Sequence, residues 1–270
     1  MKLFFRRYGQ AGAQPLIILH GLYGLSDNWV TFGRRIADEG FDVIIPDQRN
    51  HGNSPHSDAF NYIALTEDLD ELVEDLGFEQ PALLGHSMGG KVAMRYAMEK
   101  PEKVKKLLIA DISPRSYGSR PQHVAIIEAM QSVNFHQVKS RSAVEQILDQ
   151  RISDIRIRQF IMKNLHWRDK DQLEWKLNLN GIRDNLHQMF DTVETDLEFL
   201  KPCLFIRGGN SDYILPSDYP LIRKNFPFAE IITIEGASHW VHAEAPEQFY
   251  LLASGFLTGR PDWYTETETM

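Results

Sequence analysis

Gly85-His86-Ser87-Met88-Gly89 is the pentapeptide that says most about how this chain folds. It directly follows an apolar run at residues 81–84 and precedes a segment with helical apolar spacing at residues 91–99. The pattern predicts a strand, a sharp turn with Ser87 at its apex, and a helix. Small residues on both sides of the serine let the strand and helix backbones approach closely, so Ser87 Oγ is expected to be exposed. Gly-rich turns are common between strands and helices. The motif therefore indicates a catalytic serine only if a base, an acid and oxyanion donors occur elsewhere in the chain.

Short apolar runs alternate with segments of helical period along most of the chain. We expect strands at residues 2–8, 16–19, 42–45, 81–84, 106–110, 203–206 and 230–234. We expect helices at residues 29–37, 65–76, 91–99, 220–226 and 247–257. This alternation is typical of an α/β fold with a mostly parallel, doubly wound sheet that helices cover on both faces.

Residues 112–195 interrupt this alternation. They contain no convincing buried strand, but they have amphipathic helical spacing at residues 123–130, 143–150 and 155–165. We therefore expect a helical cap inserted between two late core strands and packed over the carboxyl edge of the sheet. The core would then comprise residues 1–111 and 196–259, and residues 260–270, which end in Thr-Glu repeats, would form a mobile tail.

Composition narrows the classes of function. The chain has 270 residues, 43% of them hydrophobic, which is enough for one large core. Its net charge of -8 disfavours binding to nucleic acid. The single cysteine, Cys203, lies in an apolar run and is expected to be buried and unreactive. No run reaches transmembrane length and the first eight residues resemble an edge strand, so we expect a soluble, cytoplasmic protein that acts on a small molecule.

A serine hydroxyl is a weak nucleophile, so a histidine must take its proton and later return it to the leaving group. Of the ten histidines, His239 lies just after the last expected strand and before the final helix, which is the favoured position for this base. His242, three residues later, is expected to pack near the start of the helix. His20, His51 and His86 follow or end strands, where they are expected to hold backbone groups around the site.

Two backbone amides are expected to stabilise the oxyanion that forms when the serine attacks a carbonyl. Met88 directly follows the serine at the start of the expected helix, which makes its N–H one candidate. The second candidate is Leu22, in the loop at residues 20–24 after an early strand. The loop sequence alone is weak evidence for an oxyanion donor. The evidence is stronger when Ser87 and His239 are considered with it.

Two aspartates are candidates for the acid that orients the histidine. Asp212 lies in the loop that follows the strand at residues 203–206, and Asp111 ends the strand at residues 106–110. Both lie at carboxyl ends of strands near the strand that carries the serine. Their positions along the chain therefore leave both alternatives open.

Several segments together resemble the α/β-hydrolase superfamily, and in particular the bacterial YbfF-type esterases and their mitochondrial relatives. These segments are residues 20–24, 47–54, 85–91, 208–211 and 239–244. The resemblance implies a serine hydrolase for acyl esters or thioesters that uses neither a metal nor an organic cofactor. It also implies that Asp111 is the acid, with Asp212 as the alternative, and that Ser211 contacts the histidine.

The same resemblance implies that Tyr213 and Arg120 line the substrate pocket. It predicts hydrolysis of carboxylic esters or thioesters of small to medium acyl groups, including acyl-CoA, through an acyl-enzyme intermediate. One alternative is a C–C bond hydrolase or lyase, which keeps the same triad, and another is a receptor-like protein that only binds its ligand. Dehalogenases and epoxide hydrolases of this fold need an aspartate at the position of Ser87, so the serine speaks against both.

Overall fold

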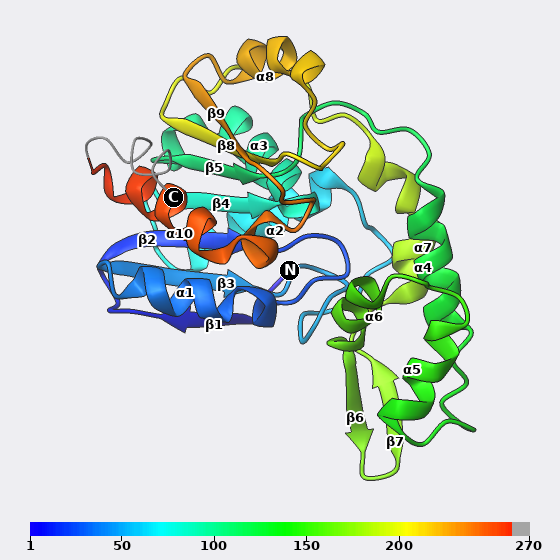
Figure 1. Ribbon diagram of the computed structural model, residues 1–270. Coiled ribbons are helices and arrows are strands. Elements are labelled where there is room, and N and C mark those ends of the chain that lie inside the picture. Colours follow the sequence, from blue (N-terminus) through cyan, green and yellow to red (C-terminus); the bar gives the residue numbers. More distant parts are fainter. Residues whose placement is uncertain (261–270) are drawn as a thin grey trace.

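A seven-stranded sheet forms the centre of the structure, a computed structural model that describes residues 1–260 (Figure 1). The strands are β1 (Phe5–Tyr8), β2 (Gln14–Leu19), β3 (Phe41–Pro46), β4 (Ala82–His86), β5 (Leu107–Ala110), β8 (Cys203–Gly208) and β9 (Ala229–Ile234). Their order across the sheet is β1-β3-β2-β4-β5-β8-β9. Only β1 is antiparallel to its neighbour, and the other pairs in this sheet are parallel. The predicted α/β fold is confirmed, and each expected core strand is present.

Helices cover both faces of the sheet (Figure 1). The main ones are α1 (Val30–Ala37), α2 (Tyr62–Asp75), α3 (Met88–Glu99), α8 (Tyr219–Asn225) and α10 (Pro246–Thr258). Side chains along a strand alternate between the two faces. In β2, Leu16 and Ile18 pack in the cluster that includes residues of α1 and α10. Ile17 and Leu19 pack in the other cluster, with residues of α2, α3 and α8. Burial on both faces explains why the core strands are nearly continuous apolar runs.

The segment between β5 and β8, residues 112–195, lies beside the carboxyl ends of the parallel strands (Figure 1). We call it the inserted segment. Its elements are α4 (Pro121–Gln131), α5 (Arg141–Asp149), α6 (Ile155–Met162), β6 (Leu165–Asp169), β7 (Gln172–Trp175) and α7 (Leu179–Asp184). It therefore approaches the edge of the sheet at which Ser87 follows β4.

The antiparallel hairpin of β6 and β7 was not expected from the sequence. Within it, only Leu165 and Leu173 are buried, and the other residues are half-buried or exposed. Such short strands carry no apolar run that periodicity could detect. The helix expected at residues 155–165 is shorter than predicted, because α6 ends at Met162 and the chain then turns into β6.

Short helices complete the described chain: η1 (Ser26–Trp29), η2 (Pro101–Lys103), η3 (Leu186–Phe190), η4 (Pro216–Asp218) and α9 (Val241–Glu244). Cys203 is buried in β8, where burial raises the pKa of its thiol. No helix within residues 1–260 has the length and hydropathy needed to cross a bilayer. The predicted mobile tail falls almost entirely on residues 261–270, outside the described residues.

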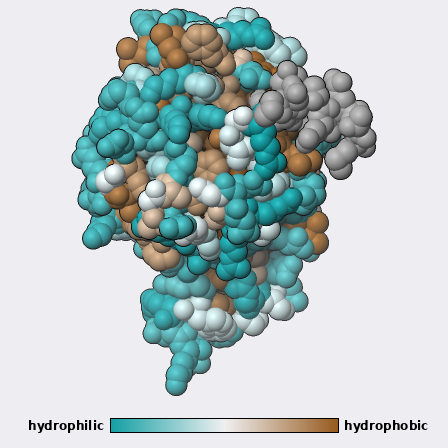
Figure 2. All heavy atoms as spheres, turned by 90° about the vertical axis from the view of Figure 1, so that its left-hand side faces the viewer, coloured by the Kyte–Doolittle hydropathy of each residue, from teal (hydrophilic) through white to brown (hydrophobic). Residues whose placement is uncertain are grey.

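Figure 2 shows the face at the amino ends of the parallel strands, opposite the inserted segment. Hydrophilic residues cover most of this face, and hydrophobic residues form small, scattered areas between them (Figure 2). Scattered exposed apolar residues are normal for a protein surface.

Candidate active site

Ser87 lies at the sharp turn between β4 and α3, with φ 52° and ψ -121°. Few residues other than glycine adopt positive φ, so the fold must hold the serine in this conformation. The flanking glycines make this possible. A Cβ on Gly85 would lie 2.4 Å from the Gly89 carbonyl oxygen, and a Cβ on Gly89 would lie 2.4 Å from the Leu19 carbonyl oxygen. The predicted strand, turn and helix are present, and Ser87 is half-buried at the apex.

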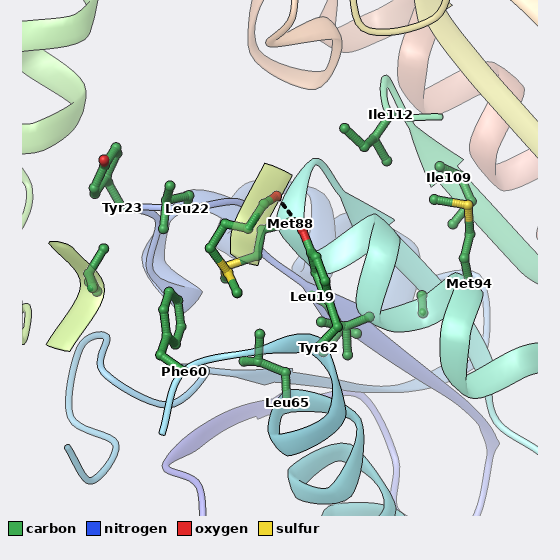
Figure 3. Close-up of a cluster of buried hydrophobic side chains, with 14 of the residues drawn as sticks. Leu19, Leu22, Tyr23, Phe60, Tyr62, Leu65, Met88, Met94, Ile109 and Ile112 are labelled. Carbon is green, nitrogen blue, oxygen red and sulfur yellow. Dashed lines mark hydrogen bonds between the residues drawn. The ribbon is translucent and has the colours of Figure 1, made fainter. Parts of the chain in front are cut away.

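A rigid apolar layer supports this turn. Figure 3 shows Met88, the residue after the serine, among buried side chains from several elements, which are Leu19, Leu22, Phe60, Tyr62 and Leu65. The Tyr62 hydroxyl donates to the carbonyl oxygen of Met189 in the inserted segment at 2.8 Å, the dashed line in Figure 3. The turn thus packs against this apolar layer, and Tyr62 in the layer is hydrogen-bonded to the inserted segment.

His239 lies in the loop after β9, within reach of Ser87. Its Nε2 is 3.0 Å from Ser87 Oγ, and its Nδ1 donates to Asp111 Oδ2 at 2.8 Å. The ring of Tyr213 stacks on the imidazole with a centroid distance of 3.7 Å. His86 Nε2 donates to the carbonyl oxygen of His239 at 2.9 Å. The imidazole is therefore held on several sides, with one nitrogen toward the serine and the other toward a carboxylate.

Asp111, at the end of β5, is fully buried and has a φ of 49°. Besides the bond from His239, its Oδ1 accepts from the amide of Gly208 at 2.9 Å, and its Oδ2 accepts from the hydroxyl of Ser211. A buried carboxylate is costly unless donors satisfy it. These donors from β8 and the following loop fix the carboxylate against the imidazole.

Asp212, the alternative acid, lies elsewhere. Its side chain is 64% exposed and forms an ion pair with Arg120 at 2.8 Å. Among the hydrogen bonds within residues 1–260, none joins Asp212 to His239. The structure therefore brings Asp111 to the histidine and directs Asp212 outward. Ser211, which was expected to contact the histidine, donates instead to Asp111, and no hydrogen bond within residues 1–260 joins it to His239.

The amides of Leu22 and Met88 both lie beside the serine. Met88 is the first residue of α3, where backbone N–H groups lack a partner in the helix. The loop that carries Leu22 is held by bonds from Gly24 N to Gly21 O at 2.9 Å and from Tyr23 N to His51 Nε2 at 3.1 Å. Neither candidate amide has a hydrogen-bond acceptor within residues 1–260. Both are available to a ligand oxygen.

The other histidines near the site bond or pack against the residues that surround it. His20 Nε2 accepts from the amide of Gln48 at 3.0 Å, and His242 stacks on Trp29 with a centroid distance of 4.2 Å. Burial lowers the pKa of His51 and of His242 to about 3. Burial also lowers the pKa of His20, and that of His86 falls well below its usual value. At neutral pH these rings are uncharged and serve as donors, acceptors or packing surfaces.

A cavity of about 200 Å³ opens beside Ser87 and His239, and Tyr213 lines it. Arg120 does not line this cavity. It borders a neighbouring pocket, and its guanidinium lies 4.8 Å from the centroid of the Tyr213 ring. No cluster of side chains suited to holding a metal ion occurs in the described part of the chain.

Sequence reasoning missed the lining residues that the inserted segment contributes. These are Gln122, His123, Ile126, Ile157 and Phe160, from α4 and α6. Helical periodicity indicated the helices that carry most of them, but no motif distinguishes a side chain that faces the cavity from one that faces the interior of the segment. The apolar members give the cavity a mainly hydrophobic wall.

Comparison with known proteins agrees with this geometry. A family model described as alpha/beta hydrolase fold matches residues 14–137. The sn-1-specific diacylglycerol lipase ABHD11 of Xenopus laevis is 37% identical over 246 residues, which cover 89% of this chain and 78% of that protein. The chain belongs to the α/β-hydrolase family.

Two further relatives of this α/β hydrolase are named as esterases. Esterase YbfF of Escherichia coli is 31% identical over 238 residues, which cover 88% of this chain and 91% of that protein. A solved structure titled marine microorganism esterase is 40% identical, with a TM-score of 0.90, and the match covers 94% of this chain and 99% of that one. The resemblance to YbfF-type esterases is confirmed.

Proposed function

We propose that this α/β hydrolase cleaves carboxylic esters through an acyl-enzyme intermediate on Ser87. The observation that carries the proposal is the run of hydrogen bonds from Asp111 through His239 to Ser87, at the wall of a mainly apolar cavity. The names of the relatives, which are esterases and lipases, support ester hydrolysis.

In the first half of the reaction, Ser87 Oγ attacks the acyl carbonyl while His239 Nε2 takes its proton. Asp111 accepts a hydrogen bond from Nδ1–H of His239, which keeps the imidazole in the required tautomer and stabilises its charged form. The amides of Leu22 and Met88 donate to the oxygen on which negative charge develops. The groups involved are already in position, so little reorganisation is needed as the charge forms.

In the second half, His239 returns the proton to the departing alcohol, which leaves the acyl group on Ser87. Water then enters, loses a proton to His239 and attacks the acyl-enzyme. The acid is released and the serine regains its proton. Ser211 takes no part in these proton transfers, and its hydroxyl positions the Asp111 carboxylate.

Residues 112–195 act in this proposal as a cap over a core of residues 1–111 and 196–259. The cap supplies much of the apolar wall that excludes water from the bound ester. Thioesters, including acyl-CoA, are cleaved by the same steps, since a thiolate is a good leaving group and the oxyanion is stabilised in the same way. Tyr213 serves both as a wall of the pocket and as a stacking partner of His239.

A hydrolysis panel tests the proposal. Purified protein is given aryl esters of increasing acyl length and acyl-CoA thioesters, together with the Ser87→Ala variant. We expect turnover of uncharged esters and a loss on the order of 10⁶ in kcat for the variant, because the nucleophile is gone.

Three outcomes would contradict the proposal. Retention of most activity by Ser87→Ala would exclude the serine as nucleophile. Labelling of Ser87 by a fluorophosphonate without turnover of any ester or thioester would favour a receptor-like protein. If a C–C substrate were cleaved and no ester were, the lyase or C–C hydrolase alternative would replace the proposal.

A further inference from the structure

Two cavities meet at Ser87. The larger, of about 200 Å³, is also lined by His239 and Trp240. The smaller, of about 20 Å³, lies toward Met88 and is not lined by His239. We call them the outer cavity and the inner compartment. Besides Ser87 and Met88, the inner compartment is lined by Leu22, Tyr62, Ile112, Tyr117, His123, Met189, Phe190 and Tyr213.

A hydrogen-bonded pair stands between the two spaces. His123 and Tyr213 line both, and His123 Nε2 lies 3.2 Å from the Tyr213 hydroxyl oxygen. The Tyr23 hydroxyl donates to the carbonyl oxygen of His123 at 3.1 Å, and the Tyr117 hydroxyl donates to that of Tyr213 at 2.5 Å. The core and the inserted segment thus hold this partition together, and a substrate bound at the serine can extend to either side of it.

The chemistry of the reaction decides which part of the substrate enters which space. The general acid must reach the departing oxygen or sulfur, so the leaving group has to lie on the side of His239. That is the outer cavity. The amides of Leu22 and Met88 take the carbonyl oxygen, and the remaining substituent of the carbonyl carbon is the acyl chain. The inner compartment, next to these amides and away from His239, is the space left for it.

We propose that the inner compartment is the acyl site and restricts this hydrolase to acetyl and propanoyl groups, while the outer cavity receives a larger apolar leaving group. This inference rests on the proposed ester hydrolysis. A space of about 20 Å³ is little more than one water needs, so it accepts one or two carbons beyond the carbonyl.

The polarity of the inner compartment also restricts the acyl group. Its tyrosine hydroxyls are engaged, with Tyr62 donating to Met189 O and Tyr117 donating to Tyr213 O. Neither lysine nor arginine lines it. An acyl chain that ends in a carboxylate would lose its water here without gaining a cation, which is costly. The compartment therefore selects uncharged acyl groups.

The test varies the acyl chain and the leaving group separately. With 4-nitrophenol as the constant leaving group, kcat/KM of the full-length protein is measured for acetate, propanoate, butanoate, hexanoate and octanoate esters. We expect acetate and propanoate to exceed octanoate by about tenfold or more, because extra methylenes do not fit. Met189→Ala enlarges the inner compartment and keeps the backbone oxygen that Tyr62 uses. It should reduce this ratio at least about fivefold.

Ile157→Ala is the matched control, since Ile157 lines only the outer cavity. It should leave the acyl-length ratio unchanged and instead lower the preference for 1-naphthyl acetate over ethyl acetate. Phe190→Leu, a milder change in the wall of the inner compartment, must shift the acyl ratio in the same direction as Met189→Ala. This second variant keeps the test decisive if Met189→Ala does not fold.

The outcomes separate this inference from the proposed function. Wild-type protein that hydrolyses none of the esters contradicts the proposed function itself. Wild-type protein that hydrolyses octanoate as fast as acetate leaves ester hydrolysis intact and overturns the inference. A change in acyl-length ratio in Ile157→Ala, with none in the variants of the inner compartment, would mean that the acyl chain lies in the outer cavity, and this also overturns it.

Discussion

At the scale of single residues, backbone strain is concentrated near the site. Within residues 1–260, the non-glycine residues with positive φ are Tyr23, Asn50, Ser87 and Asp111. Ser87 and Asp111 directly follow neighbouring parallel strands, and Tyr23 lies in the loop that carries Leu22. Such conformations persist only where the surroundings fix them. Here they aim a hydroxyl and a carboxylate at His239 from two adjacent strands.

The assignment of the acid is tested by comparing Asp111→Asn with Asp212→Asn. An amide at position 111 would present a donor or a weaker acceptor to His239 Nδ1 and favour the wrong tautomer, so kcat for 4-nitrophenyl acetate should fall roughly 10⁴-fold. Asp212→Asn removes only an exposed ion pair with Arg120 and should change kcat less than about threefold. A larger loss in Asp212→Asn than in Asp111→Asn would reverse the assignment.

At the scale of elements, the turn between β4 and α3 depends on close backbone contacts. A Cβ on Gly89 would meet the carbonyl oxygens of Leu19 and His20 at 2.4 and 2.6 Å. These oxygens belong to the end of β2 and the start of the loop that carries Leu22. The geometry of the proposed oxyanion site is therefore expected to depend on the packing of α3 on β2.

Gly89→Ala should consequently damage both stability and catalysis. Relief of the clash must move backbone, so we expect a loss of roughly 1–3 kcal/mol in the free energy of unfolding and a clear fall in kcat, measured by denaturant unfolding and ester hydrolysis. Gly40→Ala is the control. It also strains the backbone, at φ 91°, but nothing lies within 4 Å of its Cβ position. It should lower stability and leave kcat unchanged, and an unchanged kcat in Gly89→Ala would refute the coupling.

At the scale of the whole molecule, Lys91 joins the core to both ends of the inserted segment. It lies on α3 and is fully buried. Its ammonium donates to the carbonyl oxygen of Arg115 at 2.8 Å and to that of Asp191. Its Nζ also lies 4.8 Å from the centroid of the Tyr117 ring. The Lys91 side chain is thus hydrogen-bonded to both ends of the inserted segment.

This arrangement predicts a pH dependence of stability. Burial and the nearby guanidinium of Arg115 lower the pKa of Lys91 to about 7, although Asp191 opposes the shift. Between about pH 7 and the unfolded pKa of about 10.4, the unfolded chain binds a proton that the native chain does not, so this group makes the protein more stable as pH rises. Below pH 7 Lys91 is protonated in both the folded and the unfolded chain, so the free-energy cost of burying its charge is fully present.

The comparison with Lys91→Met isolates this contribution. The melting temperature of the wild type should rise relative to that of the variant between pH 7 and pH 10, even though the variant, which lacks two hydrogen bonds, is less stable overall. Melting temperatures recorded at half-unit steps of pH give the two slopes. Parallel slopes would show that Lys91 does not titrate in this range.

Features that depend on local spacing could be predicted from the amino-acid sequence. Apolar runs and helical periods located the core strands and the helices around them. This works because the residues on the buried face of an element are apolar and recur at its structural period. The turn at Ser87 was readable since Gly85 and Gly89 are required by contacts between near neighbours and one adjacent strand. The hairpin of β6 and β7 has no such apolar pattern, because most of its side chains are not buried.

Position along the chain did not distinguish Asp111 from Asp212 as the partner of His239. The family resemblance favoured Asp111, and the folded chain brings Asp111 to the imidazole. Both follow strands, but β5 and the loop after β8 point one carboxylate inward and the other to solvent. The inner compartment likewise appears only in three dimensions, since Met88, Tyr62 and Met189 come from distant parts of the chain. Sequence spacing records which face of an element is buried. The partner that each side chain meets there depends on how the strands align and how the inserted segment folds back over the serine.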